Sequence, residues 1–354
     1  MVSVRVWSQV TGPLAAVSRC AWLHDVVSRA AQVIERTVEV NGVALRVLEA
    51  GPHDGPVVVL THGFPELAYS WRHQIPALAA AGFHVLAPDQ RGYGGSSRPQ
   101  APEAYDIAAL SADVVGLLDV AGARRGAVVG HDWGAVVAWS TPLLHPDRVA
   151  AVAGLSVPPV PRPRTPPTEA FRRIFGDNFF YILYFQQPGP ADAEMAADPG
   201  RALRRMLGGM RIPGNPEEEA SAVRMLEPGP QGFIDRLPEP DRLPDWLTTE
   251  ELDHYVHEFT RTGFTGALNW YRNFDRNWRI MADPPARTIA VPALFVGGCA
   301  DPVLNFTKIS RAREVVSGPY REVMLQGAGH WIQQERPAQI NTELLNFLSD
   351  VRWT

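Results

Sequence analysis

Short continuous apolar runs alternate with segments of helical period in two separated parts of the chain. Runs of this kind are typical of strands in a parallel sheet whose two faces are both covered by helices. They span residues 57–60, 83–87, 127–129, 149–155, 293–296 and, less purely, 321–325. The pattern therefore predicts an α/β fold with a mostly parallel central sheet.

An antiparallel hairpin is expected to open this sheet. Residues 37–40 and 43–49 are strand-like and flank the dipeptide Asn41-Gly42. Asn-Gly supplies the positive φ angles that a two-residue hairpin turn requires.

The alternation stops after residue 156. The proline-rich stretch 157–167 can form neither a regular helix nor a central strand, and the residues after it are aromatic and mostly helical in pattern. We therefore expect a helical lid inserted into one α/β domain. The predicted organisation is an N-terminal extension (1–32), a core domain (33–156 and 288–354) and a lid domain (157–287). The extension is interpreted as weakly packed, with an amphipathic anchoring helix around 21–33 as the alternative.

Composition excludes several classes of protein. A hydrophobic content of 45% in 354 residues is enough for a globular core, and 33 basic against 38 acidic residues give a net charge of -5, so nucleic-acid binding is not expected. Cys20 and Cys299 lie far apart, with neither disulfide nor zinc-site spacing. No apolar run is long enough to cross a bilayer or to form a signal-peptide core. A cytoplasmic location is expected.

The segment Gly130-His131-Asp132-Trp133-Gly134 lies between a strand run and an apolar helix start. It has the pattern of a nucleophile elbow, with Asp132 in place of the usual serine. A serine that attacks a saturated carbon would leave an ether, which water does not readily cleave. A carboxylate leaves an ester, which activated water can hydrolyse. The aspartate therefore points to attack at sp³ carbon, as in epoxides and alkyl halides.

An oxyanion hole is expected near this turn. His62-Gly63-Phe64-Pro65 directly follows a buried strand. The backbone N–H groups of Phe64 and Trp133 would bind the oxyanion that forms when water attacks an Asp132 ester. A tight glycine–proline turn without catalytic role is the alternative interpretation.

A histidine and an acid follow in the chain order of the fold. His330 lies on a glycine-rich loop after the strand at 321–325, and Asp301 follows the strand at 293–296. Because Asp132 is already ionised at neutral pH, His330 is expected to deprotonate the water of the second half-reaction. Asp301 would orient it, although an aspartate before Pro302 is also typical of a helix N-cap. The position of His330 favours it over His62, His131 and His145.

Three lid tyrosines are candidates for the acid that assists ring opening. A phenol can donate a hydrogen bond or a proton to the alkoxide that forms when an epoxide opens. Tyr181 and Tyr184 are three residues apart, and Tyr271 lies in a second helical segment. From the residues alone, each is more simply explained as a packing aromatic.

Together these motifs resemble the epoxide hydrolases of the α/β-hydrolase superfamily, over residues 38–348. The matching segments are 62–66, 69–78, 89–94 and 130–134. The sequence is similar to the soluble bacterial enzymes and to the C-terminal hydrolase domain of mammalian soluble epoxide hydrolase.

The resemblance adds expectations that the residues alone do not give. It implies that Tyr181 and Tyr271 clamp the epoxide oxygen opposite Asp132, with Trp133 beside the substrate, and that Tyr184 is structural. It also implies a cis peptide at Phe64-Pro65, a vicinal diol product, no metal or organic cofactor, and a homodimer as a common state of assembly.

Two other functions compete with this one. A haloalkane dehalogenase uses the same aspartate nucleophile but needs halide-binding N–H donors, where this chain has Phe64 and paired tyrosines. A non-catalytic receptor on the same fold is expected to lack at least one catalytic residue. The absence of a serine at the elbow disfavours an esterase.

Overall fold

The computed structural model of the chain describes residues 32–209 and 226–353, and a single eight-stranded sheet forms its centre. The strand order is β1-β2-β4-β3-β5-β6-β7-β8, with β2 antiparallel to both of its neighbours and every other adjacent pair from β4 to β8 parallel. The strands are β1 (Ile34–Val40), β2 (Val43–Ala50), β3 (Val57–Thr61), β4 (His84–Pro88), β5 (Gly126–His131), β6 (Val149–Leu155), β7 (Ala293–Gly298) and β8 (Tyr320–Leu325). The predicted α/β fold with a mostly parallel sheet is confirmed.

The predicted hairpin is present as β1 and β2. Asn41 and Gly42 have φ angles of 47° and 74°, as a tight hairpin turn requires. Strand β1 begins three residues before the predicted start at residue 37, because its first residues also pair with β2 although they do not alternate. The prediction of a weakly packed extension or anchoring helix falls on residues that lie, except for the last few, outside the described part of the chain.

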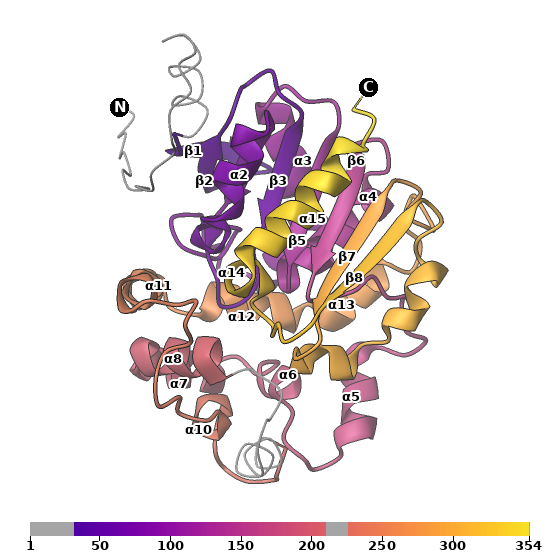
Figure 1. Cartoon of the computed structure of the whole chain (residues 1–354). Coiled ribbons are helices and arrows are strands. Elements are labelled where there is room, and N and C mark those ends of the chain that lie inside the picture. Colours follow the sequence, from indigo (N-terminus) through magenta and orange to yellow (C-terminus); the bar gives the residue numbers. More distant parts are fainter. Residues whose placement is uncertain (1–31, 210–225, 354) are drawn as a thin grey trace.

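Helices cover both faces of the sheet (Figure 1). Helices α2 and α15 lie on one face, and α3 and α4 lie on the other. In β3, Val58 and Leu60 pack with the first pair of helices, while Val57 and Val59 pack toward the second. Both faces of the central strands are therefore apolar, which explains their continuous hydrophobic runs.

The helical elements of the α/β part surround the sheet in chain order. They are η1 (Ala68–Trp71), α2 (Gln74–Ala80), η2 (Pro102–Tyr105), α3 (Ile107–Val120), α4 (Trp133–Leu144), η3 (Pro302–Phe306), η4 (Ile309–Glu314), α14 (Ile332–Glu335) and α15 (Pro337–Ser349).

A helical insertion separates β6 from β7. Its described elements are all helices: α5 (Pro167–Phe175), α6 (Tyr181–Tyr184), α7 (Pro190–Ala197), α8 (Pro199–Gly209), α10 (Phe233–Arg236), α11 (Thr249–Thr262), α12 (Thr265–Arg272) and α13 (Phe274–Ile280). They gather at one end of the sheet (Figure 1). The proline-rich stretch continues without helix or strand to the start of α5. The exact limits of a lid domain at 157 and 287 stay a prediction.

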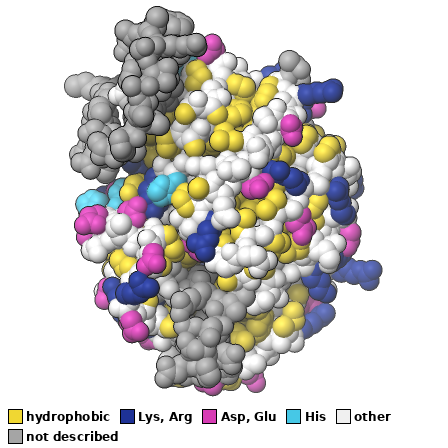
Figure 2. Space-filling model, in the orientation of Figure 1, with side chains coloured by type: hydrophobic (Ala, Val, Ile, Leu, Met, Phe, Trp, Pro, Cys, Tyr) yellow, Lys and Arg dark blue, Asp and Glu magenta, His cyan; other side chains and the backbone are white. Residues whose placement is uncertain are grey.

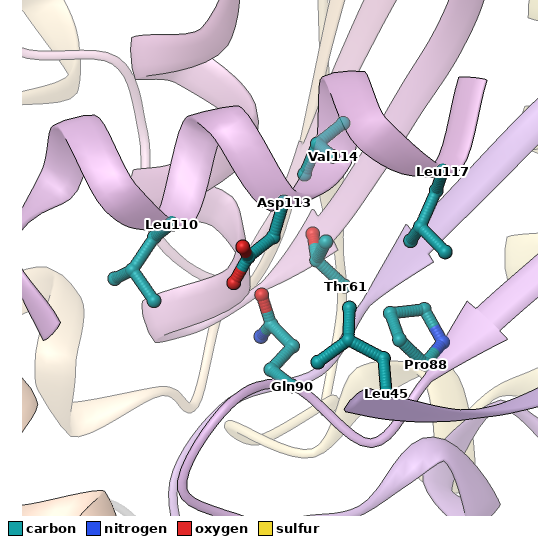
Figure 3. Close-up of a pocket in the computed structure, with 8 residues that line it drawn as sticks. All are labelled: Leu45, Thr61, Pro88, Gln90, Leu110, Asp113, Val114 and Leu117. Atoms are coloured by element: carbon teal, nitrogen blue, oxygen red, sulfur yellow. The ribbon is translucent and has the colours of Figure 1, made fainter. Parts of the chain in front are cut away.

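A small cavity of about 10 Å³ lies between the sheet and α3 (Figure 3). It is lined by Leu45, Thr61, Pro88, Gln90, Leu110, Asp113, Val114 and Leu117. This volume is about what one water molecule needs, and none of the candidate catalytic residues lines it. The cavity therefore belongs to the core and is not a substrate site.

The described surface is mixed in character. Acidic and basic side chains are interspersed with apolar ones on the face drawn in Figure 2. Within residues 32–209 and 226–353, no helix has both the length and the apolar composition needed to span a bilayer.

Candidate active site

Asp132 occupies a sharp turn between β5 and α4. Its φ and ψ angles are 51° and -118°, a conformation that non-glycine residues rarely adopt. A Cβ atom at Gly130 would lie 2.0 Å from the carbonyl oxygen of Gly134, and one at Gly134 would lie 2.0 Å from that of Thr61. The two glycines of the motif are therefore needed so that strand, turn and helix can approach this closely.

The two carboxylate oxygens of Asp132 have different surroundings. The backbone N–H of Phe64 donates a hydrogen bond to Oδ1 at 2.9 Å, and Nε2 of His330 lies 3.6 Å from Oδ2. Burial alone would raise the pKa of Asp132, but His330 and the Phe64 N–H outweigh it, so this pKa lies below its ordinary range. Asp132 is therefore a carboxylate at neutral pH, with Oδ1 held and Oδ2 open on the histidine side.

The loop that carries Phe64 has the geometry implied by the resemblance. The Phe64-Pro65 peptide bond is cis, and the Phe64 N–H faces Asp132. Trp133, the second expected oxyanion-hole residue, is the first residue of α4 and is buried directly beside the nucleophile position.

His330 and Asp301 come together from the ends of β8 and β7. Nδ1 of His330 lies 2.9 Å from Oδ2 of Asp301, while Oδ1 of Asp301 accepts the N–H of Val303 at 2.8 Å as the N-cap of η3. Both interpretations of Asp301 therefore hold at once. Burial would lower the pKa of His330, but the charges and hydrogen bonds of Asp301 and Asp132 raise it well above its ordinary value.

The two expected lid tyrosines lie together above this site. The rings of Tyr181 in α6 and Tyr271 in α12 have centroids 6.1 Å apart, and the ring of Tyr271 packs edge-on against that of Trp133 at 5.1 Å. Burial and the charge of Asp132 raise the pKa of both phenols, so both stay protonated at neutral pH. Tyr184 instead donates a hydrogen bond to Oε2 of Glu194 at 3.1 Å within the lid.

A buried ion pair behind the nucleophile was not predicted from the sequence. Nδ1 of His131 lies 2.7 Å from Oε2 of Glu66, and Nε2 lies 2.8 Å from the backbone oxygen of His330. Both partner atoms are acceptors when Glu66 is ionised, so both ring nitrogens of His131 carry a proton. Glu66 also accepts hydrogen bonds from three N–H donors, on Gly63, Gln333 and Gln334. The pair thus fixes the backbone that carries the catalytic histidine candidate.

The available signal for this pair was the presence of Glu66 in a motif that is otherwise glycine, proline and aromatic. A carboxylate placed directly after a buried strand needs a partner. His62, by contrast, is held as a neutral ring: it accepts the N–H of Gln90 at 3.0 Å and donates to the oxygen of Gly63 at 2.9 Å, and burial lowers its pKa.

The mostly parallel sheet, the helical insertion and the aspartate elbow define a hydrolase of the α/β-hydrolase fold, and residues 56–188 match the family described as alpha/beta hydrolase fold. Epoxide hydrolase A of Mycobacterium tuberculosis is 69% identical over 315 residues, which cover 89% of this chain and 97% of that protein. The bifunctional epoxide hydrolase 2 of Sus scrofa is 39% identical over 87% of this chain and 53% of its own length. The crystal structure of epoxide hydrolase A from Mycobacterium thermoresistibile is 65% identical, with a TM-score of 0.87 over 90% of this chain and 99% of that one. The chain belongs to the epoxide hydrolases.

Proposed function

We propose that this enzyme converts epoxides and water to vicinal diols through a covalent ester on Asp132. The observation that carries the proposal is the placement of Asp132 on the elbow. One of its oxygens is bound by the Phe64 N–H, and the other faces His330, which is itself paired with Asp301.

In the first half-reaction, Oδ2 of Asp132 attacks an epoxide carbon and the ring C–O bond breaks. The negative charge moves to the former epoxide oxygen, which Tyr181 and Tyr271 stabilise by hydrogen bonds and protonate. Their raised pKa values favour the return of a proton to the tyrosine that gives one up.

In the second half-reaction, His330 accepts a proton from water, and the resulting hydroxide attacks Cγ of the Asp132 ester. The Phe64 N–H already binds the oxygen that becomes the oxyanion, and the Trp133 N–H is the second proposed donor. The bond between Cγ and the alkyl oxygen then breaks, which releases the diol and restores the carboxylate.

Ester formation would itself prepare His330 for this role. In the free protein two carboxylates face the imidazole and raise its pKa. Esterification removes the charge of Asp132, so the pKa of His330 falls and its extra proton is released to solvent. The neutral imidazole then forms when a base is needed.

Single-turnover hydrolysis of an aryl epoxide in ¹⁸O-water, with enzyme in excess, tests this mechanism. Mass analysis of the Asp132 peptide is expected to show the label in Asp132, with an unlabelled diol from the first turnover. A labelled diol with unlabelled Asp132 would mean direct attack by water and would overturn the proposal. If no diol forms, chloride release from chloroalkanes tests the dehalogenase alternative.

Two variants assign the steps separately. Asp132→Ala is expected to abolish diol formation, because no ester can form. His330→Gln is expected to trap the alkyl ester on Asp132, visible as a mass increase equal to that of the substrate. Full turnover by either folded variant contradicts the assigned role.

A further inference from the structure

We propose that Glu49, His53 and His84 form a binding site for a late first-row divalent metal ion such as Zn²⁺, at the end of the sheet opposite Asp132. One ligand atom from each side chain lies within 4.8 Å of the other two. Glu49 is in β2, His84 begins β4, and His53 is in the loop that follows β2.

The cluster is remote from the proposed chemistry because of the strand directions. Strands β3, β4 and β5 are parallel, so His84 at the start of β4 and Asp132 after the end of β5 lie at opposite ends of the sheet. A role of this cluster in the epoxide site is therefore excluded by the topology.

The local backbone holds the three side chains toward one another. Glu49 and His84 come from the adjacent antiparallel strands β2 and β4, and their side chains are both 2% exposed. The N–H of Gly55 donates to the oxygen of Pro52 at 2.9 Å, which closes a turn with His53 at its second position. The imidazole rings of His53 and His84 have centroids 5.0 Å apart.

The donor set and spacing suit a borderline metal ion. Two imidazole nitrogens and one carboxylate oxygen are ligands that Zn²⁺ accepts, whereas Mg²⁺ and Ca²⁺ prefer oxygen alone. Bonds of about 2.0–2.1 Å in a tetrahedron put neighbouring ligand atoms roughly 3.3 Å apart. Nδ1 of His53 lies 3.4 Å from Oε1 of Glu49, and Nε2 of His84 lies 2.6 Å from it.

A metal ion would replace the proton that Glu49 and His84 now share. The 2.6 Å contact is a hydrogen bond in which His84 donates from Nε2. Binding breaks this N–H bond, releases the proton to solvent and opens the contact by about 0.7 Å. The side chain of His53 is 76% exposed, so the fourth ligand position faces solvent and water can occupy it.

Arg36 in β1 opposes a second cation. Its Nε contacts Oε2 of Glu49, so its positive charge lowers the pKa of Glu49 and would repel an incoming metal ion. This contact gives the proposal an unusual signature, because loss of Arg36 is expected to tighten metal binding while loss of His53 weakens it.

Calorimetric titration of the full-length protein with ZnCl₂ tests the site, with MgCl₂ as the ion that should not bind. The wild-type protein is expected to bind one Zn²⁺ per chain and to release protons. His53→Ala is expected to weaken binding by about tenfold or more, and Arg36→Gln is expected to strengthen it. His257→Ala removes another exposed histidine, on α11, and serves as the matched control with unchanged binding.

Thermal unfolding gives a second readout. Zn²⁺ is expected to raise the melting temperature of the wild type and of His257→Ala but not that of His53→Ala. Epoxide hydrolysis without added metal should be equal in all four proteins. Absence of Zn²⁺ binding, or equal affinity of His53→Ala and the wild type, would overturn the proposal.

Discussion

Asp132 and His330 carry opposite charges in the free protein, and the neutral side chain of an Asp132→Asn variant imitates the charge of the proposed ester. Because the pKa of His330 is raised by both carboxylates, removing one of them should lower it. We expect a fall of about 1–3 units, measured by NMR titration of the imidazole C–H protons. Glu314→Gln, which changes an exposed carboxylate paired with Arg311, is the control. An unchanged His330 pKa in Asp132→Asn would mean that Asp132 does not hold the proton on His330.

Tyr181 and Tyr271 differ from Tyr184 in what their hydroxyl groups can reach. Loss of one hydrogen bond to a developing alkoxide costs about 1.5–3 kcal/mol, so each single Tyr→Phe change at 181 or 271 should slow ring opening roughly 10- to 100-fold. The double variant should be slower still. Tyr184→Phe, which loses only its bond to Glu194, should open the ring at the wild-type rate. Single-turnover kinetics of ester formation measure all four, and a slow Tyr184→Phe would reverse the assignment.

At the scale of elements, the elbow depends on two close backbone approaches. A Cβ at Gly134 would lie 2.0 Å from the oxygen of Thr61, whereas a Cβ at Gly42 meets nothing within 4 Å although its φ is also positive in the hairpin turn. Gly42→Ala should therefore cost only about 1 kcal/mol for the left-handed backbone. Gly134→Ala should cost about 3 kcal/mol or more, since backbone atoms must move. Urea unfolding measures both, and equal losses would contradict this explanation.

The same elements show what the sequence could predict. Local signals suffice for the strands, for the Asn41-Gly42 turn and for the elbow, because each depends on residues that are adjacent in the chain. The chain order of Asp132, Asp301 and His330 was enough to predict that they meet, since strand ends of a parallel sheet share one edge.

Contacts between distant elements could not be predicted in this way. Nε of Arg72 donates to Oε1 of Glu251 at 2.7 Å across 179 residues, and its NH1 donates to Gln334 at 2.6 Å. Nothing near Arg72 in the sequence indicates that its partners come from α11 in the lid and from α14. The Glu66–His131 pair escaped prediction for the same reason, because its partners belong to two different loops.

For the whole molecule, the buried charges should make stability depend on pH. Burial would raise the pKa values of Glu66 and Asp89, but His131 acts on the first, Arg46 on the second and backbone N–H groups on both, and the net pKa of each is lowered. A carboxyl whose pKa is lower in the folded state stabilises the protein above its unfolded pKa of about 4, and this contribution is lost as the pH falls through the folded pKa. Asp113 acts in the opposite sense, because burial raises its pKa despite the pair with Arg91.

We therefore expect the free energy of unfolding to fall by about 2 kcal/mol or more between pH 7 and pH 3, measured by urea unfolding at each pH. Glu66→Gln should be less stable at pH 7 and should show a shallower fall, since one coupled proton is missing. The exposed Glu314 also has a lowered pKa, caused by Arg311, but solvent screens this pair. Glu314→Gln should therefore follow the wild-type curve. If Glu66→Gln and the wild type lose stability in parallel, proton binding at the pair behind the nucleophile does not contribute to acid unfolding.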